Sequence, residues 1–499
     1  MSEKSIIIIG AGIAGLAAGC YGQMNGYHTR IFELHDKPGG LCTAWKRKGY
    51  TFDGCIHWLV GSRPGSAFNR LWQELGAAQG RTFINHDEFT RHEGADGKTF
   101  IVYTNLDRLE QHMLELAPAD APVIREFIGA ARQFARVDMP PGTPDGAWDK
   151  LKAGLSMLPM LAPLRKWGQV SMQDLAARFS GPFVREAFEQ LFAMPDFPVA
   201  AVMMTLAWQH NQNAGYPIGG SLEFSQSIER RYLDLSGQIH YASRVEKILV
   251  EGDRAVGVRL ADGTEHRGDV VLSAADGHAT IFDMLEGKYL DDTIRGYYER
   301  WPIFASLVQV SLGVARDLSD VPHSFSFPLS QPVILADESR DRLSLRHLGN
   351  DPTMAPKTKS VAEVMFDSNH DYWKQLAQDR ERYDAEKQQI AITVMEQIDR
   401  RIPGLMGQVE VVDVATPLTT ERYTGNWRGS MEGWLITTQN MGMAFGGGMS
   451  KTLPGLGNFY MAGQWVEPGG GVPTAAMSGR NIIQTLCKQD KQRFVTTLP

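Results

Sequence analysis

Short apolar runs alternate with helix-like stretches at the start of the chain. Ile6–Ile9 is a run of four β-branched residues, which is typical of a central parallel strand buried on both faces. Small, helix-forming residues follow over Leu16–Tyr21, and a second strand is expected over Thr29–Phe32. This order predicts a βαβ unit at the beginning of an α/β protein.

A glycine motif lies between the first strand and the helix. Gly10, Gly12 and Gly15 form G-x-G-x-x-G, and Ile13 and Ala14 occupy the positions before the last glycine. The first glycine permits a tight turn, the second lets the backbone approach a pyrophosphate, and the third lets helix and strand pack closely. The free N–H groups of the helix N-terminus then face the phosphates. We therefore expect these five residues to bind a dinucleotide.

An acidic residue ends the second expected strand. Glu33 lies 18 residues beyond Gly15, close to the spacing of roughly 20 that dinucleotide-binding units show. A carboxylate there accepts hydrogen bonds from a ribose diol and repels a 2′-phosphate. FAD or NAD therefore fits better than NADP.

A second glycine pair decides between FAD and NAD. Gly39 and Gly40 follow Glu33 almost immediately, and two adjacent glycines allow another close backbone approach to an extended cofactor. The order of dinucleotide motif, acidic residue, Gly-Gly loop and Gly49–Gly54 resembles one branch of the amine-oxidase-like flavoproteins. That branch contains phytoene desaturases, carotenoid isomerases and retinol saturases. The resemblance implies that the cofactor is FAD.

The resemblance continues near the other end of the chain. Gly457–Gln464 is expected to form a short strand ending in a turn, and a helix is expected over Thr474–Cys487. By the resemblance, this helix points its N-terminus at the flavin, where a positive helix end stabilises negative charge. The resemblance also implies that Val245 holds the adenine through its backbone. The further cofactor contacts that it implies are Leu41, Thr43, His57, Gly463, Gln464, Val472 and Pro473.

A third block lies in the middle of the chain. A helix is expected over Leu222–Leu235, and Gly237–Val245 and Ala255–Leu260 alternate like strands. Asp262-Gly263 is a hairpin signal. Val270–Asp276 is then expected to return to the nucleotide-binding sheet.

These patterns predict an α/β fold with two domains, which suits a chain of 499 residues. The first is a discontinuous, Rossmann-like FAD-binding domain made of residues 1–61, 215–280 and 455–490. The second is an α+β substrate domain with an antiparallel sheet and a helical lid, made of residues 62–214 and 281–454.

Composition narrows the classes of function. The formal net charge is −7, which argues against a nucleic-acid surface because such a surface needs a basic face. No Cys-x-x-Cys pair and no metal-ligand cluster is visible, so we expect no metal site and reduced thiols. No signal peptide and no apolar stretch of about 18 residues is found. We expect a cytoplasmic protein, and leave open whether it contacts a membrane peripherally and whether it is a monomer or a homodimer.

Two apolar segments of the substrate half invite functional and structural interpretations. Leu151–Trp167 is apolar, is expected to be broken by its two prolines and ends in two cations and a Trp. It is either a membrane-docking or substrate-entry segment, or an ordinary helix packed on the core or at a dimer contact. Phe192–Trp208 is rich in methionine, which suits a long apolar ligand or a plain core.

Asp371–Ile402 is expected to be one charged helical stretch on the surface.

Polar residues near the expected flavin are the candidates for catalysis. These are His57, Glu432 and Glu467, with Tyr423 as a weaker choice, and each has the alternative of a purely structural role. We expect a desaturase, saturase or cis-trans isomerase that acts on a C–C or C=C bond of a long apolar polyene or isoprenoid-like lipid.

Two alternatives remain at this stage. One is a flavin amine oxidase on a soluble amine, which Leu41 disfavours because amine oxidases usually carry Arg after the glycine pair. The other is a non-catalytic flavoprotein that escorts prenylated partners.

Overall fold

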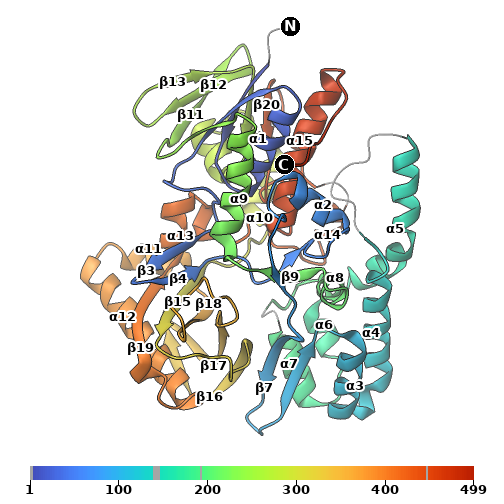
Figure 1. Cartoon of the computed structure of the whole chain (residues 1–499), viewed down its shortest axis with the longest axis vertical. Helices are drawn as coiled ribbons and strands as arrows, with labels where there is room; N and C mark the ends of the chain where they lie inside the picture. The colour runs from blue at the N-terminus through green and yellow to red at the C-terminus, as the bar shows by residue number, and fades with distance from the viewer. Residues whose placement is uncertain (1–3, 139–146, 192–193, 446–447) are drawn as a thin grey trace.

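A parallel sheet lies at the top of the molecule in Figure 1. The computed structural model describes residues 4–138, 147–191, 194–445 and 448–499. All neighbouring strands of this sheet are parallel. In spatial order the strands are β10 (Gln238–His240), β2 (His28–Phe32), β1 (Ser5–Ile9), β14 (Val270–Ser273) and β20 (Phe459–Met461). The expected Rossmann-like, discontinuous sheet is confirmed, with β1 at its centre.

The central strand is buried on both faces, as its apolar run predicts. Ile6 and Ile8 belong to a core shared with three helices, whereas Ile7 and Ile9 belong to a different core on the other face. Successive side chains of a strand point to opposite faces, so one run of four residues serves two cores. The three helices are α1 (Ile13–Met24), α9 (Gly220–Asp234) and α15 (Val472–Gln489), and α1 packs against both of the others.

A three-stranded antiparallel sheet covers the second face. It contains β11 (Val245–Glu251), β12 (Arg254–Leu260) and β13 (Glu265–Arg267). The Asp262-Gly263 turn joins β12 to β13, as expected, and Gly263 has a φ of +86°. The single strand expected over Gly237–Val245 is wrong. The chain turns at Ala242, which has a φ of +50°, so that β10 ends at His240 and β11 only begins at Val245.

A seven-stranded sheet forms the lower half of the molecule. All of its neighbouring strands are antiparallel except β16 and β7. In order the strands are β19 (Val409–Ala415), β15 (Leu307–Val314), β18 (Ser360–Asp367), β17 (Glu338–His347), β16 (Ser324–Leu335), β7 (Glu88–Glu93) and β8 (Thr99–Tyr103).

Two helices pack on this sheet where one was expected. The charged stretch Asp371–Ile402 divides into α11 (His370–Leu376) and α12 (Arg380–Arg401). Asp379 separates them because its side chain accepts the N–H groups of Glu381 and Arg382 and so caps a new helix.

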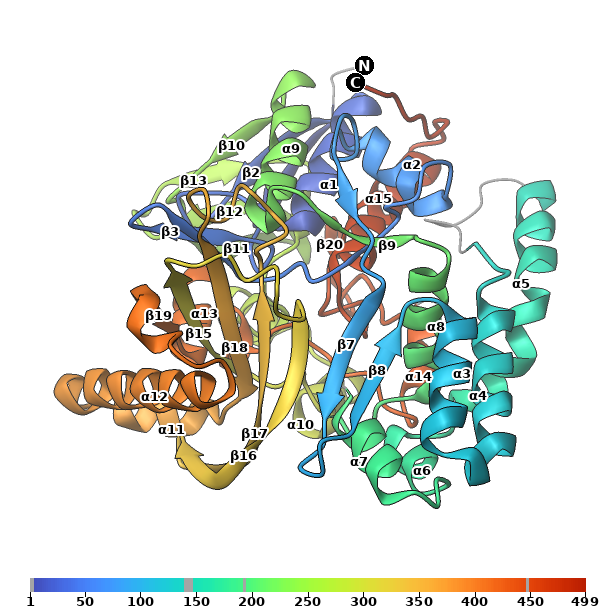
Figure 2. The same ribbon diagram turned by 60° about the horizontal axis from the view of Figure 1, so that its bottom comes forward.

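Helices between residues 106 and 210 form a layer beside the β7–β8 edge (Figure 2). Their apolar residues share one core. They are α3 (Leu106–Leu116), α4 (Ala121–Phe134), α5 (Ala147–Trp167), α6 (Met172–Ala176), α7 (Pro182–Gln190) and α8 (Val199–His210). The prolines at 159 and 163 do not interrupt α5, contrary to the expectation of a broken segment.

Short elements connect these layers. They are β3 (Ala44–Arg47), β4 (Tyr50–Asp53), β5 (Leu59–Val60), β6 (Phe83–Ile84), β9 (Ala214–Pro217), α2 (Ala67–Glu74), α10 (Asp292–Arg300), α13 (Pro417–Thr424) and α14 (Met441–Phe445). Within the described residues, no helix is both long enough and apolar enough to cross a membrane.

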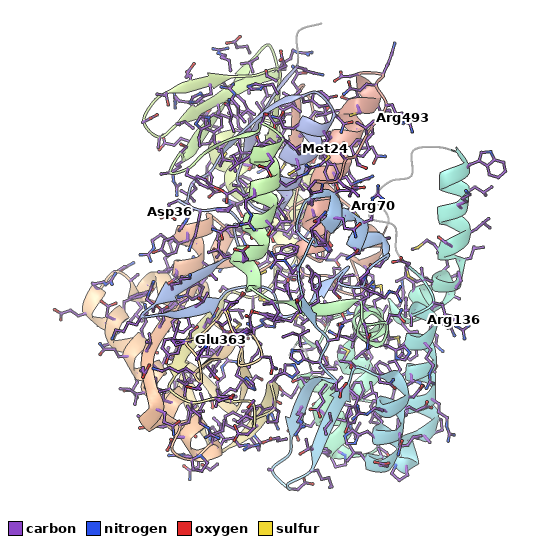
Figure 3. The ribbon with its side chains drawn as sticks, in the orientation of Figure 1. Met24, Asp36, Arg70, Arg136, Glu363 and Arg493 are labelled. Atoms are coloured by element: carbon purple, nitrogen blue, oxygen red, sulfur yellow. The ribbon has the colours of Figure 1, made fainter. Side chains whose placement is uncertain are left out.

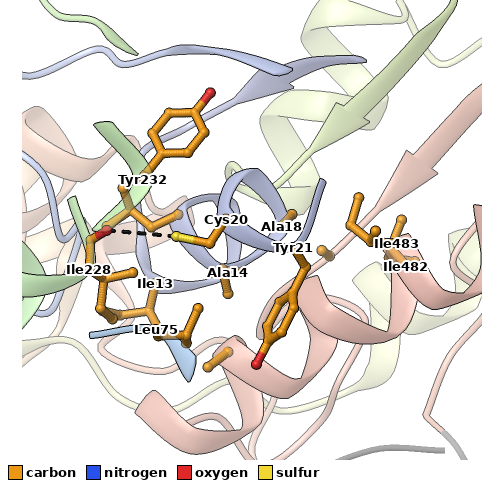
Figure 4. Close-up of a cluster of buried hydrophobic side chains, with 14 of the residues drawn as sticks. Ile13, Ala14, Ala18, Cys20, Tyr21, Leu75, Ile228, Tyr232, Ile482 and Ile483 are labelled. Atoms are coloured by element: carbon orange, nitrogen blue, oxygen red, sulfur yellow. Dashed lines mark hydrogen bonds between the residues drawn. The ribbon is translucent and has the colours of Figure 1, made fainter. Parts of the chain in front are cut away.

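Small residues let α1 lie close to its neighbours in the core shown in Figure 4. Ala14 and Ala18 face this core, and the Cys20 thiol donates to the Ile228 carbonyl at 3.7 Å. On the α15 side, a Cβ at Gly479 would overlap the carbonyl oxygen of Ala14. The position of α15 against α1 therefore depends on a glycine.

We predict that Gly479→Ala destabilises the protein by about 1–3 kcal/mol, because the added methyl group forces α15 away from α1. Gly129→Ala in α4 is the matched control, since a Cβ there meets nothing within 4 Å. That change is expected to stabilise by up to about 1 kcal/mol through helix propensity. Urea unfolding of both variants measures the difference. If the free energy of unfolding changed in the same direction in both variants, the proposed contact between α15 and α1 would be contradicted.

Candidate functional site

The first turn of α1 has the geometry of a phosphate-binding loop. Gly10 has a φ of +97°, and a Cβ at Gly15 would overlap the Gly10 carbonyl oxygen. Gly12 differs, because a Cβ there would meet only the Gly39 carbonyl, at 4.0 Å. Protein packing therefore does not require a glycine at position 12, and the space above it is open to a ligand.

The N-terminus of α1 leaves its N–H groups available. No side chain caps it and no acidic residue lies in its first turn. Ile13 and Ala14 belong to that turn, whose N–H groups have no acceptor within the helix. Such an uncapped turn is a ready binding site for a pyrophosphate.

The Gly-Gly loop lies directly against this turn. Gly39 donates its N–H to the Ala11 carbonyl at 2.9 Å and forms a parallel bridge with Gly12. Its φ of +111° and the +60° of Gly40 are left-handed conformations that favour glycine. Just beyond, the Thr43 hydroxyl oxygen is buried without a hydrogen-bond partner in the described part of the protein. A bound cofactor would supply that partner.

Glu33 sits at the end of β2, beside the phosphate loop. Its carboxylate accepts the N–H groups of Ala11 at 2.6 Å and His35 at 2.8 Å. Burial raises the pKa of Glu33, and these backbone donors act in the opposite direction. Each oxygen keeps a further lone pair that can accept from a ribose hydroxyl. Ser243 donates to the Glu33 carbonyl at 2.8 Å, so the turn leading into Val245 also lies at this strand end.

The turn that follows β20 lies against the glycine motif at the start of α1. Gly463 follows β20 with a φ of +98° and donates its N–H to the Ser478 hydroxyl at 3.0 Å. A Cβ at Gly463 would lie 3.4 Å from the Ala14 Cβ, so this turn passes the first turn of α1. Gln464 donates its side-chain amide to Asn426 Oδ1 at 3.1 Å. Residues nearly 450 positions apart thus form one surface.

A cavity of about 1340 Å³ opens from this surface. It exceeds the roughly 300–1,000 Å³ of common small-molecule pockets. Among the predicted residues, those in its lining are Gly40, Leu41, Thr43, His57, Tyr423, Glu432, Glu467, Val472 and Pro473. The remaining predicted cofactor residues, Gly463 and Gln464 among them, lie outside that lining.

The helix that borders the cavity begins two residues earlier than expected. It starts at Val472 rather than near Thr474, after Gly471 with a φ of +90°. No side chain caps it and its first turn holds no carboxylate. Its positive end is therefore available to the cavity, which Gly469 through Thr474 line.

His57 lines the cavity, where the surrounding protein leaves part of the residue exposed. Burial, and next the charge of Arg346, hold the pKa of His57 well below its usual range. The ring can donate one hydrogen bond and accept another, and carries no charge at neutral pH.

Glu432 lies against the turn that precedes α15. A Cβ at Gly470 would come within 3.0 Å of a Glu432 carboxylate oxygen. Burial alone raises the pKa of Glu432 to about 7. A carboxyl with this pKa exchanges a proton readily near neutrality, which is what a general acid or base requires.

The other two candidates have different surroundings. Glu467 forms an ion pair with Lys451 at 2.8 Å. Burial raises the pKa of Glu467, and the Lys451 charge opposes that rise. Tyr423 is half exposed and stacks edge-on against His35 at 5.0 Å, so it borders the nucleotide-binding strand.

An ion pair that the sequence analysis missed lies behind His57. Arg346 donates to Glu363 at 2.6 Å and to the Ile56 carbonyl at 3.3 Å, and Glu363 also accepts the Asp53 N–H. Glu363 is buried within the molecule (Figure 3). A signal was present, since Glu363 is a carboxylate between the apolar residues Ala362 and Val364 of β18. Its partner, on a different strand, could not be read from spacing.

The fold and the site define a flavoprotein oxidoreductase, with a dinucleotide-binding sheet that opens into a large cavity. The chain belongs to the family described as flavin containing amine oxidoreductase, whose model matches residues 13–482. Its cofactor is FAD, and the residues around α1 fit that group.

Curated relatives match nearly the whole chain. Prolycopene isomerase of Daucus carota is 23% identical, covering 96% of this chain and 79% of that protein. Phytoene desaturase (lycopene-forming) of a Paracoccus strain is 26% identical, covering 97% of both chains.

Solved structures share the fold. An oxidoreductase from Methanosarcina mazei superposes with a TM-score of 0.61 at 16% identity, covering 97% of this chain and 100% of that one. Putrescine oxidase bound to putrescine gives 0.61 at 14% identity, covering 97% and 99%.

We predict that Gly12→Ala lowers the affinity for FAD at least about tenfold, or ~1.4 kcal/mol, because the methyl group fills the space that a pyrophosphate needs. The backbone of Gly12 has a φ of −66°, which alanine adopts freely. Unfolding of the apoprotein should therefore change by less than about 0.5 kcal/mol. Titration of apoprotein with FAD measures affinity, and Gly129→Ala is the control. A destabilised apoprotein would show that Gly12 serves packing instead.

Proposed function

We propose that this FAD-dependent enzyme acts on a C–C or C=C bond of a long apolar polyene or isoprenoid-like lipid. The observation that carries the proposal is a cavity whose lining extends from the turn before α15 to an apolar helical wall. The sequence relatives described above are named for reactions of polyenes, which supports the same substrate class.

The far wall of the cavity suits a long flexible hydrocarbon. Adaptable methionines and two aromatic rings, contributed by α5, α8 and the segment before α8, form it. These residues are Met157, Met194, Phe197, Met204 and Trp208. Methionine side chains adjust to irregular apolar ligands, and such a surface offers no charge to recognise a small amine.

The chain's own residues supply orientation and proton transfer. When bound, FAD supplies the redox centre that exchanges a hydride with a substrate carbon. Gly10 through Gly15, Glu33, Gly39, Gly40 and the Gly463-Gln464 turn would hold it, and Val472 and Pro473 would border it.

We assign separate roles to the polar candidates. Glu432 takes the proton that leaves the substrate during desaturation, on a carboxylate oxygen, because its pKa of about 7 lets it be ionised at neutral pH. His57 orients substrate or cofactor as a neutral hydrogen-bonding ring. Glu467 and Lys451 form a paired charge that shapes the turn before α15.

Three broader expectations stay within this proposal. They are the division into a FAD-binding domain and a substrate domain, peripheral contact with a membrane, and the state of the protein as monomer or homodimer.

The proposal is tested with purified holoenzyme and acyclic polyenes of different saturation, delivered in detergent micelles without oxygen. We expect the visible absorption of the flavin to change on mixing, and chromatography to detect a product altered in its double bonds. Polyamines and monoamines are supplied in parallel with oxygen. Peroxide from an amine, with no change in any polyene, would establish an amine oxidase instead.

We predict that Glu432→Gln lowers the rate of polyene conversion by about 10²–10⁴-fold, the range for loss of a general base. In the wild type the rate should rise as pH increases through about 7, because Glu432 is protonated below that value and cannot accept a proton. The Gln variant should bind FAD normally and lose this pH dependence. Glu467→Gln is the comparison. If that variant alone loses the pH dependence, Glu467 is the base.

A further inference from the structure

Helix α5 lies at the edge of the molecule in Figure 1. It carries a row of exposed apolar side chains. The exposed fractions are 74% for Trp148, 51% for Leu151, 56% for Leu155, 54% for Leu158 and 52% for Leu161. Successive members are three or four residues apart, so they lie on one side of the helix. Single exposed leucines are ordinary, whereas a continuous apolar surface marks an interaction site.

The opposite side of α5 joins the helix to the protein and to the cavity. Met160 and Trp167 are buried in the core of the helical layer. Met157, on that same side, lines the cavity together with Phe197. The exposed leucines and the Met157 side chain that lines the cavity therefore lie on opposite sides of one helix.

The charges on α5 indicate whether an anionic surface or a second copy of the chain binds to its apolar side. The sequence of α5 contains four cations and one carboxylate, Asp149, although the whole protein has a net charge of −7. Lys152 and Arg165 are exposed, and Lys166 pairs with Glu126. An anionic surface complements this distribution. A second copy packed through the same face would bring like charges together.

We propose that α5 docks the protein on an anionic lipid bilayer, with its leucines among the acyl chains and Lys152 and Arg165 at the headgroups. The helix lies in the interface rather than across it, as amphipathic anchors with cationic flanks do. A bilayer-dissolved substrate then reaches the cavity beside Met157 without crossing water. The inference rests on the proposed function for this substrate, while the docking itself is measured without turnover.

The test uses holoenzyme and vesicles of phosphatidylcholine alone or mixed with phosphatidylglycerol. We expect the protein to sediment with the mixed vesicles and less with the neutral ones, and salt to weaken binding. Leu155→Glu combined with Leu158→Glu should lower the partition coefficient at least tenfold. Ile334→Glu is the matched control, because Ile334 is 65% exposed on β16 and should bind as the wild type does.

A second readout locates the contact. Bromine-labelled acyl chains quench tryptophan fluorescence on contact, so part of the wild-type emission should be lost on binding. Trp148→Phe should remove most of that quenching and leave sedimentation nearly unchanged.

Three results would overturn the inference. They are wild-type protein that stays free of mixed vesicles, equal binding by the double variant, and a wild-type dimer that the double variant converts to monomer without any vesicle binding. The last would make α5 an interface between copies.

Turnover separates this inference from the proposed function. The double variant should convert micelle-delivered polyene at the wild-type rate and vesicle-delivered polyene much more slowly. If the wild type converts no polyene in either form yet binds vesicles through α5, the proposed function fails and the docking stands.

Discussion

Main-chain contact around the first turn of α1 is the constraint on which the site depends. Gly15 lets α1 touch the turn after β1 at Gly10, Gly39 donates a hydrogen bond to Ala11 in the same turn, and Gly479 lets α15 approach Ala14. At Gly15 and Gly479 the backbones approach to a distance that a side chain would prevent. As a result, strands, loop and terminal helix converge on one point, where their N–H groups and helix ends are concentrated. An anionic, extended cofactor is the ligand that such convergence favours.

Desolvation by the surrounding protein shifts the pKa values of two groups that line the cavity. The same burial that makes His57 neutral raises the pKa of Glu432 to about 7, because both effects penalise a charge in an apolar space. The ionised pair of Arg346 and Glu363 is tolerated nearby because the two charges and their hydrogen bonds compensate each other. The same buried surroundings therefore provide space for an apolar substrate and give Glu432 a pKa near neutrality.

Local sequence predicted the nucleotide-binding half well, for physical reasons. The apolar run at Ile6–Ile9, the glycines after it and Glu33 act within a few residues of each other, so their spacing carries the geometry. The helix boundary at Asp379 was not predicted, because one capping aspartate does not stand out among the many charged residues of this stretch. The Arg346–Glu363 pair could not be predicted, since strand pairing across the sheet brings it together. Likewise, the sequence showed that Leu151–Trp167 is apolar, but only the structure shows which of its side chains are exposed and which are buried.

The order of strands in the parallel sheet also has a consequence for biosynthesis. Its outer strand, β20, and the helix α15 that packs on α1 come from the last tenth of the chain, whereas β1 and α1 come from the first. During translation, the phosphate-binding turn emerges long before its partners. The early segment must therefore wait, with apolar surface unpaired, until Phe459–Gln489 has left the ribosome. Cofactor loading in this way has to follow the synthesis of that segment.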